Sequence, residues 1–218
     1  PMEILPNAIS GLIPDERPGL PSNEGRRPFR LLALTRYYPH KNLEAIVDCF
    51  RAFRSELGNV EVLMTIDRGD HARAARLLDR IQADGLGDVI QNLGPVPQED
   101  LPALFATVDG LLMPTLLESF SGTYLEAMTF GCPILTSDRD FSREICGAAA
   151  LYFEPTAASQ MRDAIIMLRD TPGLRDGLRR AGRERRYAYE ASWQEIAHNA
   201  LASIEQLATP PPSDPPLP

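Results

Sequence analysis

The chain has 218 residues, 44% of them hydrophobic and 24% charged, which is enough to bury one good-sized core and is typical of a single soluble domain with attached ends. Its formal net charge of −8 and pI near 5.0 argue against a nucleic-acid surface or a basic membrane anchor, so any phosphate site must be local. Cys49, Cys132 and Cys146 show no CxxC spacing, which favours reduced, partly buried thiols in a cytoplasmic protein over disulfides or a zinc site. No apolar run approaches the length of a membrane span.

The first predicted strand, Arg30–Thr35, is a short apolar run after an irregular segment rich in Pro and Gly. Two cations follow it, Arg36 and Lys41, and then a helix is predicted from about Leu43 to Leu57 with Asn42 as its cap. A single Lys is usually a solvated surface charge, but two bases at the carboxyl end of a strand in an acidic protein favour an anionic ligand. A signalling domain of similar build would place acidic residues there to hold magnesium.

The next elements alternate between strands and helices. Further strands are predicted at Asn59–Ile66 and Val89–Leu93, and helices at Asp70–Asp84 and Gln98–Thr107. The loop Gly94-Pro-Val-Pro97 follows the third strand, where a tight turn alone would explain the Gly-Pro pair.

The centre of the chain is a strand–loop–helix–strand unit. Val108–Met113 predicts a buried strand, Thr123–Phe130 a helix that ends at Gly131, and Cys132–Thr136 another short strand. Such a crossover joins parallel strands and leaves its loop at their carboxyl edge, where open α/β sheets bind ligands. The fold is completed by a short helix at 141–146, a strand at 150–153 and tail helices at about 157–169, 173–189 and 193–207. We therefore predict an α/β fold with a doubly wound parallel sheet.

The loop of this central unit carries groups that suit a bound phosphate and sugar. The stretch Ser119-Phe120-Ser121-Gly122-Thr123 supplies hydroxyls, a Gly that lets the backbone approach a ligand, and the unpaired N–H groups of a helix start. Glu118 and Glu126 flank it, and a carboxylate can accept hydrogen bonds from two neighbouring sugar hydroxyls at once. Thr123-x-x-Glu126 also matches a capping box, in which Glu126 satisfies only a backbone N–H. This stretch alone favours neither the sugar contact nor the helix cap as the role of Glu126.

Four features occur together along this part of the chain: Glu118-x7-Glu126, Ala127-Met128, Gly131-x-Pro133 and Arg143-Glu-Ile-Cys-Gly147-x-Ala-Ala150. Together they resemble the donor-side signature of retaining glycosyltransferases with the GT-B fold, the large family 4 or glycosyl transferases group 1. The match runs from about Ile4 to about Trp193. A lone E-x7-E would be weak, but this combination of spacings is specific.

The resemblance implies a role for each candidate residue. The family has G-R-x-x-x-x-K after its first strand, where Arg and Lys grip the donor diphosphate; Arg36 and Lys41 match this pattern, with Thr35 in place of the Gly. Glu118 would hold hydroxyls of the transferred sugar, and Glu126 those of the ribose. The predicted catalytic residues are thus Arg36, Lys41 and Glu118, with no metal ligand. The other implied donor contacts are Gly94 and Val96 beside the base and, in the central loop, Ser119, Phe120, Ser121, Gly122 and Thr123, where the 122–123 backbone meets the distal phosphate.

The resemblance also implies a domain plan. Residues 1–28 would be an interdomain linker and irregular segment, 29–192 the nucleotide-sugar-binding Rossmann-like domain, 193–208 a C-terminal crossing helix and 209–218 a proline-rich tail. We expect the chain to be the donor half of a two-domain enzyme, folded but inactive without its N-terminal acceptor domain. The expected donor is of the UDP or GDP type, with no other cofactor, no divalent metal and no nucleic acid. Peripheral membrane association is expected only through the missing domain.

Rival functions stay open on the sequence alone. A module that holds a nucleotide sugar without catalysis would share the fold and the site. A GT-B-like nucleotide-sugar epimerase or a sugar phosphorylase would share the architecture. A phosphorylase needs a Lys that holds pyridoxal phosphate, and Lys41 is the only Lys in the chain.

Overall fold

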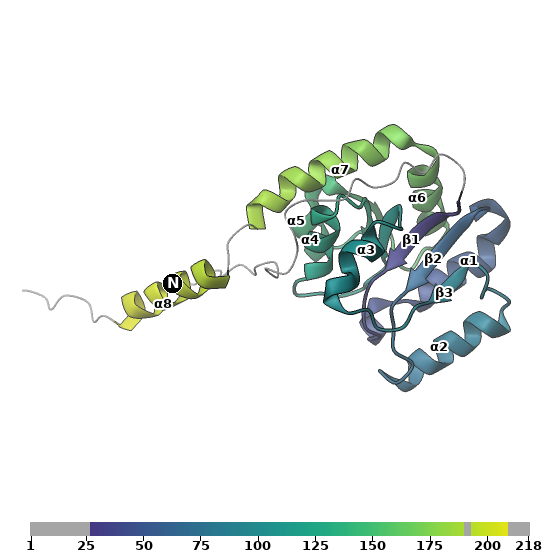
Figure 1. The fold of residues 1–218 in the computed structure, drawn as a ribbon, viewed down its shortest axis with the longest axis horizontal. Coiled ribbons are helices and arrows are strands. Elements are labelled where there is room, and N and C mark those ends of the chain that lie inside the picture. Colours follow the sequence, from purple (N-terminus) through teal and green to yellow (C-terminus); the bar gives the residue numbers. More distant parts are fainter. Residues whose placement is uncertain (1–26, 190–192, 209–218) are drawn as a thin grey trace, which may run out of the picture.

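The computed structural model describes residues 27–189 and 193–208 (Figure 1). The predicted tail at 209–218, and the predicted linker at 1–28 except for its last two residues, lie outside these ranges. Among the described residues, no helix combines the length and the apolar character needed to cross a membrane.

Six parallel strands form one sheet in the order β3-β2-β1-β4-β5-β6, as a doubly wound fold requires. The strands are β1 Phe29–Ala33, β2 Val60–Met64, β3 Ile90–Asn92, β4 Gly110–Met113, β5 Ile134–Ser137 and β6 Ala150–Phe153. The strand order reverses between β1 and β4, which pair through Leu31 opposite Gly110 and Leu32 opposite Leu111. The predicted fold class is confirmed, and the loops after β1 and β4 meet at the switch point of the sheet.

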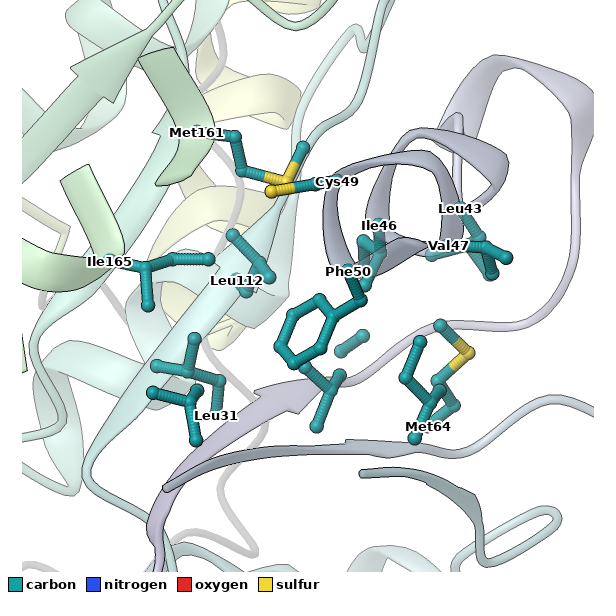
Figure 2. Close-up of a cluster of buried hydrophobic side chains, with 14 of the residues drawn as sticks. Leu31, Leu43, Ile46, Val47, Cys49, Phe50, Met64, Leu112, Met161 and Ile165 are labelled. Atoms are coloured by element: carbon teal, nitrogen blue, oxygen red, sulfur yellow. The ribbon is translucent and has the colours of Figure 1, made fainter. Parts of the chain in front are cut away.

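Helices cover both faces of the sheet (Figure 1). They are α1 Glu44–Leu57, α2 Ala72–Ala83, α3 Leu101–Phe105, α4 Gly122–Thr129, α5 Asp140–Cys146, α6 Ala158–Asp170, α7 Pro172–Arg186 and α8 Trp193–Ala208. Neighbouring residues of a strand point to opposite faces. Accordingly, Leu31 packs into one core cluster with α1, α2 and α6, whereas Leu32 packs into a second with α3, α4 and α5. Figure 2 shows Phe50 of α1 among Leu31, Leu112 and Met64 in the first cluster.

A glycine is required where the switch-point strands meet α6. A Cβ at Gly110 would lie 2.9 Å from Cδ2 of Leu168 and 3.0 Å from Cδ2 of Leu31. Side-chain contacts of this kind are closer than a packed core accepts without movement. The small residue at the start of β4 therefore lets α6 lie close against the sheet.

Several local expectations differ from the structure. Asn42 was expected to cap α1, but it has a left-handed backbone with φ of 55° and its side chain bonds elsewhere, so Leu43 precedes the helix instead. The helix predicted at Gln98–Thr107 is a 3-10 turn, Gln98–Asp100, followed by the short α3, because Pro102 within it removes a backbone donor. The three cysteines are free and fully buried rather than partly buried.

Candidate functional site

The candidate site is built by two loops at the carboxyl edge of the sheet, one after β1 and one after β4. The loops are bonded to each other: the Leu116 N–H donates to the His40 carbonyl at 2.7 Å. The Asn42 amide donates to the carbonyls of Pro114 and Pro155, both at 3.1 Å. Because one side chain ties the loop after β1 to segments far along the chain, the two loops form a single platform.

Lys41 and Glu118 form an ion pair across this platform. Their side chains are only 12% and 11% exposed, so solvent and salt weaken the attraction between them less than they weaken ordinary surface ion pairs. The family resemblance assigned these residues to two different parts of a ligand, the diphosphate and the sugar. The structure brings them into direct contact.

Arg36, the second predicted cation, is bound to a carboxylate that the sequence analysis did not single out. Its Nη2 lies 2.5 Å and its Nε 3.0 Å from Oδ1 of Asp70, in the loop after β2. The Asp70 side chain is 4% exposed, whereas that of Arg36 is 74% exposed. The hydrogen bond from Arg36 lowers the pKa of Asp70. The sequence carried no local signal that singled out Asp70, because it opens the helix predicted at Asp70–Asp84 and acids at a helix start are common.

Glu126 lies inside α4 and not at its cap. The residue before the helix is Ser121, so Glu126 is the fifth helical residue and Thr123 the second. The capping-box reading is therefore wrong, because it needs Thr123 before the helix and Glu126 three residues later. Within the described ranges the half-buried carboxylate makes no hydrogen bond or ion pair, and burial raises its pKa. A partly buried carboxylate without a partner is costly, which makes it a candidate for binding a hydroxyl.

The stretch from Ser119 to Thr123 ends the loop after β4 and opens α4. Ser121 is buried, Ser119 is exposed, and Phe120 packs at 6.2 Å from the Tyr189 ring. A Cβ at Gly122 would meet no atom within 4 Å, so open space lies beside the first residue of the helix. The first N–H groups of a helix lack partners within it and favour an anion.

Gly94 and Val96 lie after β3, the edge strand two places from β1. Gly94 has a φ of 75°, which favours glycine, and open space where a Cβ would stand. Val96 is half-buried against the second core cluster. The structure places both at the carboxyl edge of the sheet but shows no bond from them to Arg36, Lys41 or either glutamate.

Comparisons with known proteins show which family and fold this chain resembles. Residues 17–185 match the family model described as Glycosyl transferases group 1. The D-inositol 3-phosphate glycosyltransferase of Arthrobacter sp. (strain FB24) is 29% identical over 178 residues, which are 80% of this chain and 42% of that protein. The chain spans less than half the length of the first curated relatives that it matches.

Solved structures share the fold. Sucrose-phosphate synthase from Thermosynechococcus elongatus aligns with a TM-score of 0.71 at 24% identity, over 84% of this chain and 46% of that chain. HepE of Anabaena, solved in complex with UDP and glucose, aligns with a TM-score of 0.69 at 16% identity, over 84% of this chain and 49% of that chain.

Proposed function

From the premise that this chain belongs to the glycosyl transferases group 1 family, we propose that it binds a nucleotide-diphosphate sugar as the donor domain of a retaining glycosyltransferase. The observation that carries the proposal is the contact between Lys41 and Glu118 at the switch point of the sheet. A cation and a carboxylate at one place suit a ligand that presents an anionic diphosphate next to sugar hydroxyls.

In this proposal the donor diphosphate replaces Glu118 as the partner of the Lys41 ammonium group. A diphosphate carries more negative charge than one carboxylate and offers more acceptor oxygens, so it is the stronger partner for an ammonium group. Glu118 is then free to accept hydrogen bonds from the transferred sugar. Arg36 contacts the same diphosphate from the neighbouring end of the loop, and the N–H groups at Gly122 and Thr123 bind the distal phosphate.

Glu126 binds the ribose in this proposal. Its carboxylate is half-buried and has no partner among the described residues, so two ribose hydroxyls would supply the hydrogen bonds that it lacks. Gly94 and Val96 border the base. A donor of the UDP type is supported by the UDP in the HepE complex, whose fold this chain shares, and a donor of the GDP type is the alternative.

The proposed catalytic contribution is electrostatic. When the sugar leaves, negative charge develops on the nucleoside diphosphate, and Arg36 and Lys41 are placed to stabilise it. Fixed cations and helix N–H groups do the work that a divalent metal does in other transferases, so the proposed reaction is metal-independent. The acceptor and the other wall of the cleft belong to an N-terminal domain, and the donor domain by itself is expected to be inactive.

The test is calorimetric titration of the chain with UDP, GDP and ADP. One nucleoside diphosphate is expected to bind, and Lys41→Ala and Arg36→Ala are each expected to weaken it by roughly tenfold or more. Arg54→Ala is the matched control, because Arg54 is also paired with an aspartate, Asp88, but lies in the last turn of α1, away from the loop after β1. Failure of all three nucleotides to bind, or equal losses in the control, would contradict the proposal.

A further inference from the structure

Asp70 has no part in the roles assigned above, yet it holds one of the two proposed diphosphate ligands. Both cations of the site are paired with a carboxylate, but the two pairs differ in kind. Lys41 and Glu118 are almost equally exposed, at 12% and 11%. In the other pair the cation is 74% exposed and the carboxylate only 4% exposed.

The Asp70 carboxylate is fixed from several sides. Oδ1 accepts the two bonds from the Arg36 guanidinium, at 2.5 and 3.0 Å. Oδ2 accepts the backbone N–H of Tyr37 at 3.1 Å. The Asp70 N–H in turn donates to the Asp67 carbonyl at 3.1 Å. A ligand could not displace this carboxylate without breaking backbone bonds on both loops.

The backbone that carries the pair is also fixed. Tyr37 is 1% exposed, its ring stacks on His71 at 5.8 Å, and its hydroxyl donates to Glu44 at 2.5 Å. Arg73 binds the same glutamate at 2.9 Å. The loops after β1 and β2 are therefore joined next to the pair. Nη1 of Arg36 makes no bond to any described residue and is open to a ligand.

We infer that Asp70 is a positioning residue that keeps the Arg36 guanidinium in place for the donor diphosphate and stays bonded to it when the donor binds. The inference rests on the proposed function and adds that the two carboxylates of the site respond differently to the donor. Glu118 is exchanged for the diphosphate, whereas Asp70 is not. A long exposed Arg side chain loses conformational freedom when a ligand immobilises it, and a partner that orders it beforehand removes that cost.

The direction in which nucleotide affinity changes when Asp70 loses its charge distinguishes a positioning role from a purely electrostatic effect. Coulomb's law alone predicts that removing a negative charge beside the site strengthens the binding of an anion. Positioning predicts the opposite. Asp70→Asn keeps the volume of the side chain and removes the charge, so its effect on nucleoside diphosphate affinity distinguishes the two.

A double-mutant cycle between Asp70→Asn and Arg36→Ala tests the inference, with the dissociation constants of UDP and GDP measured by calorimetry on the 218-residue chain. Asp70→Asn is expected to weaken nucleotide binding on the order of fivefold in the wild-type background. In Arg36→Ala, where only the charge effect remains, it is expected to leave binding unchanged or slightly tighter. Asp67→Asn is the matched control: Asp67 lies in the same loop and makes no bond to Arg36, so it should leave affinity unchanged or slightly higher.

Two outcomes would overturn the inference while leaving the proposed function intact. One is tighter or unchanged binding in Asp70→Asn when Arg36→Ala weakens binding. The other is an equal loss in both backgrounds, which would mean that Asp70 acts only on the loops. If Arg36→Ala has no effect while Lys41→Ala does, the proposed role of Arg36 falls together with that of Asp70. Arg36→Lys gives a second measurement that leaves Asp70 in place: it keeps the charge, loses the two-bond contact, and should weaken binding as Asp70→Asn does.

Discussion

Glu118 and Glu126 stand eight residues apart at the two ends of one loop-to-helix turn, and the structure gives them different surroundings. Glu118 is balanced by Lys41. Glu126 has no partner in the described part of the chain, and burial raises its pKa. In the proposed site a ligand must therefore replace a contact at the first glutamate, whereas at the second it supplies one that is missing. Substitutions at the two positions should differ in size and in sign.

The largest effect is expected from Lys41→Ala, which leaves Glu118 without its cation. Nucleoside diphosphate affinity should fall by about 2 to 3 kcal/mol, because a charge-assisted contact is lost and an unbalanced carboxylate then faces the diphosphate. Calorimetry measures the loss, and adding Glu118→Gln to this variant should recover part of it. Wild-type affinity in Lys41→Ala would mean that the pair is only structural.

A smaller loss is expected from Glu126→Gln. The amide keeps an acceptor but loses the charge that strengthens hydrogen bonds from the ribose, so nucleoside mono- and diphosphates should both bind about 1 to 2 kcal/mol more weakly. Glu184→Gln, an exposed glutamate on α7, is the control for the change in net charge. Unchanged nucleotide affinity in Glu126→Gln would remove this residue from the site.

Glu118→Gln should act in the opposite direction on the free nucleotide. Because it removes the partner that competes for Lys41, nucleoside diphosphate should bind equally well or more tightly, by less than about 1 kcal/mol. Calorimetry with UDP or GDP measures the change. A clear loss of affinity would show that Glu118 orients Lys41 and does not compete with the ligand.

The smallest effect concerns stability and pH. Burial raises the pKa of Glu126 in the folded state, so ionising this carboxylate destabilises the folded chain. This destabilisation is absent below the ordinary pKa of 4.5 and is complete once the pH exceeds the folded pKa. Glu126→Gln cannot ionise and should raise the free energy of unfolding at pH 7, by less than about 1 kcal/mol. Denaturant unfolding at pH 7 and at pH 4 should show this gain shrinking in acid. A gain independent of pH would contradict the burial of the charge.

The sequence predicted the elements of the fold because apolar runs and helical periods are local signals. The six strands, their parallel arrangement and the family were confirmed by the sheet and by the family match. Strand ends shifted by one or two residues, as at Val89–Leu93, of which Ile90–Asn92 is paired. The loops after β1 and β4 were correctly expected at the carboxyl edge of the sheet, because that position follows from topology alone.

What the sequence did not predict depends on contacts between distant residues. Asn42 matched a helix cap, but its partners Pro114 and Pro155 lie 72 and 113 residues away. Asp70 had no distinguishing local pattern, and the role inferred for it depends on a bond to Arg36 across 34 residues. The capping-box reading of Glu126 was excluded only by the residue at which α4 begins.

The most direct test of the proposed donor site is the ratio of nucleotide-sugar affinity to nucleoside diphosphate affinity, measured by calorimetry in the wild type, Glu118→Gln and Glu126→Gln. The account predicts that the ratio falls in Glu118→Gln, because only the complete donor carries the sugar hydroxyls, and stays at the wild-type value in Glu126→Gln, because both ligands carry the ribose. An unchanged ratio in Glu118→Gln, or an equal fall in both variants, would contradict the assignment of Glu118 to the transferred sugar.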